Sequence, residues 1–186
     1  MMDNINGNMY QKNTSKAFQI ESTNDLIKIG LLLLLGFFAV VLRSRVNIPL
    51  KIPGHHGFEF MLLFMAGKSL SRQRYAMSIS SIGASASAFL PLFHFGNAFM
   101  PFTLLLPGII GDLIINKTGK HNLLYIAIAG GLAYSSIPLT RQIIMMVTGI
   151  PFGSLLTGLL YPFALHFIFG ALGSAAGAGI FGRFAK

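Results

Sequence analysis

The stretch PGHHGFE, Pro53 to Glu59, puts two imidazoles and a carboxylate at the start of a segment that is otherwise apolar. On a helix that begins near Gly54, Glu59 follows His55 by four residues and His56 by three, so these side chains share one helix face. Imidazoles together with a carboxylate can hold Ni, Co, Zn or Fe. The same groups can instead hydrogen-bond a polar organic molecule, or merely solvate a helix start near water. The residues alone leave these three interpretations open.

Further polar residues are candidates for the same site. Lys51 precedes the stretch, His94 and Asn97 lie in a later loop, and Arg141 and His166 border the last apolar segments. Ionisable groups in a membrane are costly, and by default they mark a site that faces the interior of a helix bundle. The predicted ligand-binding residues are Lys51, His55, His56, Glu59, His94, Asn97, Arg141 and His166. If the ligand is a metal ion, we expect His55, His56 and Glu59 to bind it.

The composition indicates whether these groups belong to a soluble protein or to a membrane protein. Of the 186 residues, 53% are hydrophobic and only 10% are charged, whereas soluble domains average about 25% charged residues. An integral membrane protein is therefore expected. The net charge of +9 comes from Lys and Arg spread thinly between apolar runs, without a nucleic-acid-binding module. The absence of cysteine excludes disulfides and thiolate metal sites.

The apolar runs predict an all-α fold, an integral membrane bundle of six transmembrane helices. A spanning helix needs about 20 mostly apolar residues. The segment Arg141–Leu160 is expected to be broken or partly re-entrant at Gly149-Ile150-Pro151, just before the last helix. Residues 1–24 form a polar cytoplasmic tail, and residues 25–186 form the transmembrane domain. The six expected helices are Leu26–Leu42, His56–Leu70, Tyr75–Phe93, Ala98–Ile115, Asn122–Leu139 and Pro162–Phe181.

The distribution of positive charge predicts the orientation. With six crossings and both termini in the cytoplasm, most Lys and Arg residues fall inside, as the positive-inside rule requires. The loops outside then receive Arg43, Arg45, Lys51 and Arg141. We therefore expect a multi-pass protein of the cell membrane, with the HHGFE motif at the outer surface.

Two further features concern packing. Asp112 is interpreted as a helix cap or an ion pair with Lys117 or a neighbouring loop, and a coupling-ion role is the alternative.

Small residues recur at four-residue steps in 78–88 and 170–178. This spacing lets helices approach closely in lipid. It predicts close packing, either within this chain or against a partner membrane protein.

The stretch VNIPLKIPGHHGFEFMLLFMAGKSLSRQRYAMSIS resembles the S components of energy-coupling factor transporters, nearest their cobalt and nickel branch. The likeness lies in an IPxP-like loop, then Gly- and His-containing residues, then an apolar helix that ends in Gly. It extends over about Ile29–Asn116. The resemblance implies capture of a vitamin or metal ion from outside, with a transmembrane coupling protein and two ATPases as partners. It also implies that Ile48–Gly57 is a lid or ligand-contact region.

The expected function is that of a substrate-binding subunit of an uptake transporter, not an enzyme, without a cofactor. It would capture a vitamin-like small molecule or metal ion and hand it to an ATP-driven module, since the chain has no GxxxxGK[ST] motif of its own. Membrane lipid is an expected partner and nucleic acid is not. Two alternatives stay open. One is a small membrane enzyme acting on a lipid or quinone through His55, His56 and Glu59, and the other is a structural subunit bound through its last helix.

Overall fold

The computed structural model describes residues 23–45, 52–90, 97–118, 122–156 and 158–182. Within these ranges all regular structure is helical, which confirms the all-α class. Lys51 and His94, two of the predicted ligand-binding residues, lie outside the described ranges, as does nearly all of the predicted tail. The elements are α2 (Thr23–Arg45), α3 (Gly57–Ser71), α4 (Ala76–Ser87), α5 (Met100–Thr118), α6 (Leu123–Thr148), the 3-10 turn η3 (Gly153–Leu155) and α7 (Leu160–Phe181).

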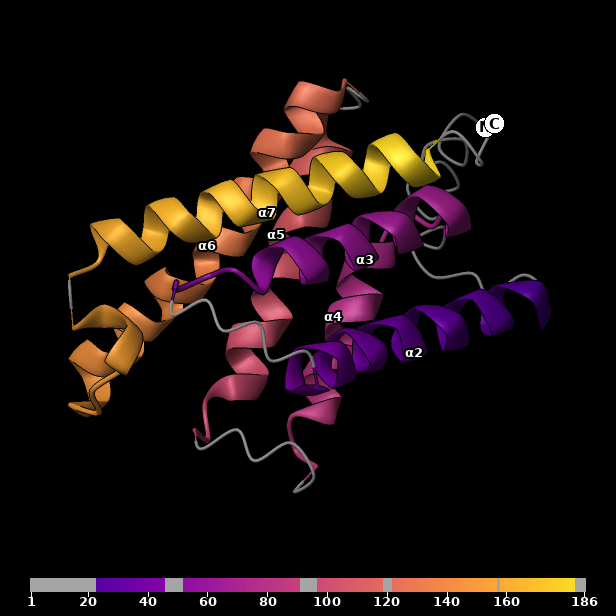
Figure 1. Cartoon of the computed structure of the whole chain (residues 1–186). Coiled ribbons are helices and arrows are strands. Elements are labelled where there is room, and N and C mark those ends of the chain that lie inside the picture. The colour runs from indigo at the N-terminus through magenta and orange to yellow at the C-terminus, as the bar shows by residue number, and fades with distance from the viewer. Residues whose placement is uncertain (1–22, 46–51, 91–96, 119–121, 157, 183–186) are drawn as a thin grey trace, which may run out of the picture.

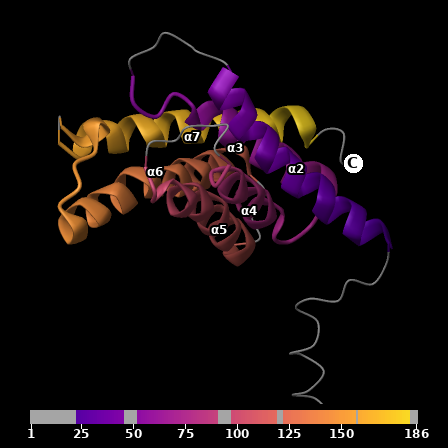
Figure 2. The same ribbon diagram turned by 90° about the horizontal axis from the view of Figure 1, so that it is seen from below.

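The helices form two layers (Figures 1 and 2). Helices α2, α3 and α7 lie side by side in one layer, and α4, α5 and α6 form the other. Helix α7 packs on α6 across the layers and on α3 within its own, while α4 packs on α2 and α5. Helix α3 therefore lies between α2 and α7, with α6 and α4 behind it. This central position explains why α3 buries several large side chains, among them Phe60, Met61 and Phe64.

Four helices are long and apolar enough to cross a membrane: α2, α5, α6 and α7. This fits an integral membrane bundle, but the prediction of six spanning helices is wrong. Helix α3 has 15 residues and α4 has 12, which at 1.5 Å per residue gives lengths of about 22 Å and 18 Å. The hydrocarbon core is about 30 Å thick. By length, α3 and α4 fall short of it.

Small residues let the helices approach closely, both between the two layers and within one of them. A Cβ atom added at Gly36 of α2 would collide with the backbone of Ser80 in α4, and one added at Gly83 would collide with Leu33. On α7, Gly173 lies against the backbone of Phe58 in α3. In lipid, van der Waals contact between closely approaching helices is a main source of helix association. The small residues of the predicted faces are thus used inside the chain, including Gly170, Gly173, Ser174 and Gly177, which are buried. These four residues therefore pack within the chain, while Ile168, Leu172 and Ile180 of the same helix are exposed.

The predicted interruption at Gly149-Ile150-Pro151 is confirmed, but the predicted end of the preceding helix at Leu139 is wrong. Helix α6 continues through Arg141 to Thr148 and contains Pro138. It ends at Gly149, whose φ of 71° is left-handed and whose N–H donates to the carbonyl of Met145. A glycine accepts this conformation without the Cβ penalty of other residues. Arg141 is therefore a residue of the last turns of α6 and not the start of a separate re-entrant segment.

Candidate functional site

The two ends of the bundle carry different polar groups. At one end, the end of α2, the start of α3, the end of α6 and the start of α7 come together, and we call this the His56 end. At the other, the end of α3, the start of α4, the end of α5 and the start of α6 meet, and we call it the Lys68 end. The predicted residues that the structure describes, apart from Asn97, lie at the His56 end.

The HHGFE motif forms the turn into α3. His55 Nδ1 donates to the carbonyl of Ile52 at 2.7 Å. The rings of His55 and His56 are stacked at a tilt, with centroids 3.9 Å apart. His56 Nδ1 lies 3.5 Å from Glu59 Oε2, as the three-residue spacing predicts. The motif therefore directs one imidazole into its own loop and the other toward the carboxylate.

The His56–Glu59 contact is not an ion pair at neutral pH. Burial, followed by the neighbouring Arg43 and His55, lowers the pKa of His56 from 6.5 to about 4, so the ring is neutral. Both facing atoms, His56 Nδ1 and Glu59 Oε2, are buried and have no hydrogen-bond partner among the described residues. Most buried polar atoms have such a partner, and each exception requires an explanation.

Charged and polar side chains from two other helices reach the same region. Tyr134 of α6 is 3% exposed and lies within electrostatic reach of Arg43, Arg141 and Glu59. The guanidinium of Arg141 donates to Ser154 Oγ at 3.1 Å. It also lies over the ring of Phe152, 5.9 Å from the centroid. The segment after Gly149 thus folds back and holds Arg141 in place.

His166 of α7 completes the group. Its Nδ1 donates to the carbonyl of Pro162 at 2.7 Å, and its ring stacks on Tyr134 with centroids 5.3 Å apart. Gly54, at φ 84°, packs so closely that an added Cβ would lie 2.7 Å from His166 Nδ1. A Cβ on Gly57 would strike the ring of Tyr134. The two glycines that flank the histidines are therefore required for the turn to pack against α6 and α7.

The structure does not bring all the predicted residues into one site. The Oδ1 atom of Asn97 accepts the N–H of Phe99 at 2.8 Å, so this side chain shapes the turn that leads into α5. Among the described residues no group of three His, Asp or Glu side chains is arranged to hold a metal ion. The geometry therefore gives no support to His55, His56 and Glu59 as a set of metal ligands.

Two members of the group were not among the predicted site residues. Arg43 was interpreted only as a topological charge, and Tyr134 was not assigned a role. A signal was available for Tyr134, since it precedes Arg141 by seven residues. That separation is close to two helical turns and puts both side chains on one face of α6. It becomes visible only when the helix is known to continue past Leu139.

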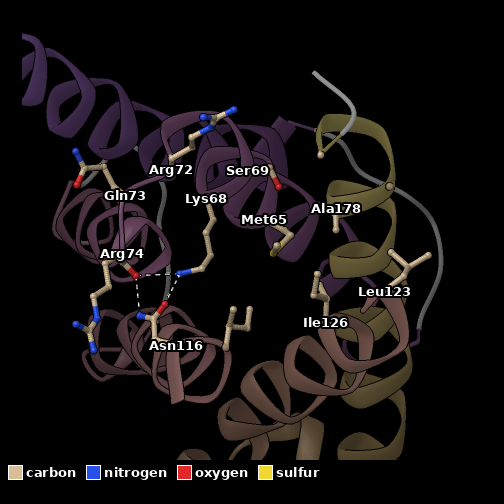
Figure 3. A pocket seen from close by; sticks show the side chains of 13 residues that line it. Met65, Lys68, Ser69, Arg72, Gln73, Arg74, Asn116, Leu123, Ile126 and Ala178 are labelled. Carbon is tan, nitrogen blue, oxygen red and sulfur yellow. Dashed lines mark hydrogen bonds between the residues drawn. The ribbon is translucent and has the colours of Figure 1, made fainter. Parts of the chain in front are cut away.

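A cavity lies at the Lys68 end, opposite to the predicted pocket (Figure 3). It has a volume of about 820 Å³. The ends of α3 and α5, the start of α6 and the last turn of α7 surround it. One wall is polar and basic, with Lys68, Ser69 and Arg72, and the facing wall is apolar, with Ile126 and Ala178.

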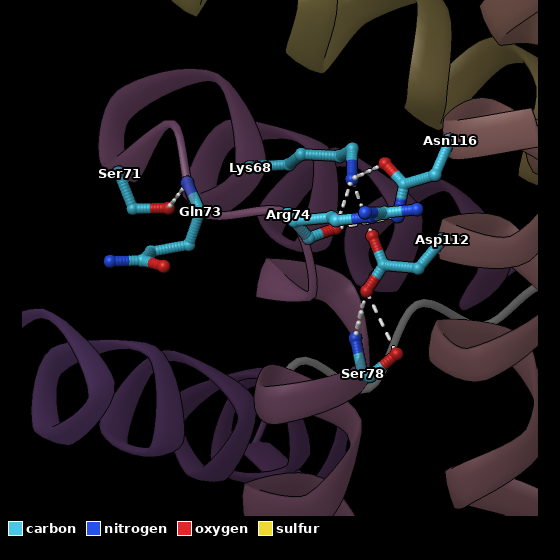
Figure 4. Close-up of polar contacts among 7 residues, drawn as sticks. All are labelled: Lys68, Ser71, Gln73, Arg74, Ser78, Asp112 and Asn116. Atoms are coloured by element: carbon cyan, nitrogen blue, oxygen red, sulfur yellow. Dashed lines mark hydrogen bonds and ion pairs between the residues drawn. The ribbon is translucent and has the colours of Figure 1, made fainter. Parts of the chain in front are cut away.

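The basic wall is anchored by a buried ion pair (Figure 4). Lys68 Nζ lies 2.5 Å from Asp112 Oδ1 and also donates to the carbonyl of Arg74 at 2.9 Å. The other carboxylate oxygen of Asp112 accepts the N–H of Ser78 at 2.7 Å and its hydroxyl at 2.8 Å. Asp112, 1% exposed, thus satisfies a free N–H in the first turn of α4. Asp112 was predicted to form a helix cap or an ion pair, and this is confirmed. Its partner in the ion pair is Lys68 and not Lys117.

A comparison with protein-family models, curated proteins and solved structures finds no match to the chain.

Proposed function

We propose that the chain is a membrane-embedded substrate-binding subunit of an uptake transporter. It captures a polar, vitamin-like small molecule at the His56 end and hands it to an ATP-driven partner module. The observation that carries the proposal is the buried pair of unsatisfied atoms, His56 Nδ1 and Glu59 Oε2. A ligand that donates hydrogen bonds to both atoms would remove the energetic penalty of leaving them unpaired.

The surrounding groups narrow the ligand class. Arg43 and Arg141 favour an anionic group such as a carboxylate or phosphate. Glu59 and neutral His56 favour an N–H or O–H donor on the same molecule. Tyr134 and His166 offer flat ring surfaces beside them. A small molecule with both an acidic group and a donor-bearing nitrogen matches this arrangement better than a bare metal ion does.

The orientation of the chain in the membrane is part of the same proposal. We assign the Lys68 end to the cytoplasm by the positive-inside rule. Among the described residues it carries five basic side chains and the His56 end carries three: Lys28, Lys68, Arg72, Arg74 and Lys117 against Arg43, Arg45 and Arg141. The His56 end then faces outward and meets a solute arriving from outside. In this arrangement α2, α5, α6 and α7 span the bilayer, and the shorter α3 and α4 pack against them.

The proposal is tested by purifying the tagged chain from its native membranes in mild detergent. We expect it to copurify with a membrane coupling protein and ATP-hydrolysing subunits, and the reconstituted complex to accumulate a small molecule in an ATP-dependent way. An isolated chain that turns over a lipid or quinone, with the turnover lost in Glu59→Gln, would establish the enzyme alternative instead. A bound metal that disappears in His55→Ala would replace the organic ligand by a metal substrate.

A further inference from the structure

We propose that the cavity at the Lys68 end binds an anionic phospholipid, with its phosphate at the basic wall and its glycerol and upper acyl chain along the apolar wall. This site is distinct from the binding site at the His56 end, about the length of α3 away.

The charge around the cavity is positive overall. Lys68 is neutralised by Asp112, 2.5 Å away. Arg72 and Arg74 also line the cavity, and no acidic side chain of the described residues forms an ion pair with either of them. Arg72 and Ser69 both line the cavity. Arg72 is exposed, and its guanidinium is directed outward at the mouth, where a lipid headgroup would meet it (Figure 3). A planar guanidinium is suited to a phosphate diester.

The backbone at Arg72 supports a role for this side chain. Arg72 caps α3 with φ of 55°, the only left-handed non-glycine residue in the described part of the chain. Glycine is the usual residue in this position because it has no Cβ. The chain carries an arginine there, at the mouth of a cavity, despite the unfavourable conformation.

The opposite wall distinguishes a lipid from a soluble anion. Ile126 and Ala178 are apolar, and Leu123 beside them is half exposed. A free phosphate would leave this surface in contact with water, whereas a phospholipid covers it with its glycerol and acyl carbons. Basic pockets between transmembrane helices on the cytoplasmic side are known to hold anionic lipid headgroups.

Gly179 of α7 provides a variant that fills the cavity without changing its charge. Gly179 lines the cavity, and a Cβ added there meets no atom within 4 Å. Gly179→Phe therefore places a ring in the open space while the helix remains intact. Gly30 of α2 has equally open surroundings and does not line the cavity. Gly30→Phe is the matched control.

The test is native mass spectrometry of the full chain released from mixed vesicles of phosphatidylglycerol and phosphatidylcholine. We expect wild type and Gly30→Phe to retain one phosphatidylglycerol in preference to phosphatidylcholine, and Gly179→Phe to lose this preference. Arg72→Gln should weaken retention about fivefold, since one basic residue contributes about 1 kcal/mol to anionic-lipid binding. Lys117→Gln removes an exposed charge at the same end that does not line the cavity, and it should leave retention unchanged.

Three results would overturn the proposal. Wild type retaining both lipids equally would show that the cavity has no preference for an anionic headgroup. Undiminished retention in Gly179→Phe would place the lipid elsewhere. Displacement of the bound species by millimolar glycerol 3-phosphate would show that the ligand is a soluble phosphate and that the apolar wall contributes nothing.

Discussion

At the scale of single residues, the lowered pKa of His56 predicts how the stability of the protein changes with pH. Its pKa is 6.5 when the chain is unfolded and about 4 in the folded protein, chiefly because burial disfavours the charged ring. Between these values the unfolded state binds more protons, so stability falls as the pH is lowered from about 6.5 toward 4. Below about 4 this contribution is fully lost.

The prediction is tested by measuring the midpoint of thermal unfolding in detergent between pH 6.5 and 4. Replacing His56 by glutamine removes the titrating group, so His56→Gln should lose less stability than wild type between pH 6.5 and 4. Above pH 7 the difference between the two proteins should be constant, because His56 is neutral in both states. Parallel curves throughout the acid range would show that His56 does not have the lowered pKa.

A second residue-scale prediction concerns the Lys68–Asp112 pair. Asp112→Ala removes the carboxylate that neutralises Lys68 and accepts two hydrogen bonds from Ser78. Breaking one partner of a buried pair typically costs about 3–5 kcal/mol because the other charge is left uncompensated. We expect losses of that order for Asp112→Ala and for Lys68→Met, measured by denaturant unfolding in detergent micelles.

The double variant supplies the control for this pair. If the two charges interact directly, Lys68→Met combined with Asp112→Ala should be more stable than the sum of the single losses predicts. Simple additivity of the two losses would indicate that the residues act independently and that the short contact contributes little.

At the scale of the elements, glycine spacing in α2 determines how closely α4 can approach. Gly36→Leu pushes a side chain into the backbone of Ser80 in α4, and overpacking of this kind costs about 1–3 kcal/mol or more. Gly30→Leu, six residues earlier on the same helix, meets open space. We expect only Gly36→Leu to lower the unfolding temperature. Equal effects of the two changes would show that α2 and α4 do not pack through Gly36.

The helices themselves could be predicted from hydropathy, and the differences between the predicted and observed boundaries have physical causes. The runs from Leu26, His56 and Pro162 gave α2, α3 and α7 to within a few residues, because an apolar segment in lipid must satisfy its backbone as a helix. Helix α6 was predicted to end at Leu139, but it contains Pro138 and continues through Arg141 to Thr148. Arg141 is bound by Ser154, and the true end is the left-handed Gly149.

The candidate site could be predicted only in part. The meeting of His56 and Glu59 follows from local helical spacing, which a single sequence contains. The partner of Asp112 is 44 residues away in the chain, and no local pattern distinguishes Lys68 from Lys117. For the same reason the approach of Arg43 to Glu59 depends on the pairing of α2 with α3.

At the scale of the whole molecule, the proposed orientation predicts which residues face each side of the membrane. The chain contains no cysteine, so single cysteines can be introduced without background labelling. Thr148 and Lys117 are exposed at the His56 and Lys68 ends respectively. In intact cells, a membrane-impermeant maleimide should label Thr148→Cys at once and Lys117→Cys only after permeabilisation. The reverse pattern would place the His56 end in the cytoplasm and exclude capture from outside.

The most direct test of the central claim is whether the His56 end of the isolated chain holds a small molecule. The chain is purified from native membranes, and its mass is measured with bound species retained. We predict an organic adduct on wild type and on Lys117→Gln. In Glu59→Gln its occupancy should fall about tenfold or more, since a hydrogen bond to a charged group contributes about 1.5–3 kcal/mol. An adduct equally abundant in Glu59→Gln, or a wild-type chain that never carries one, would contradict the account.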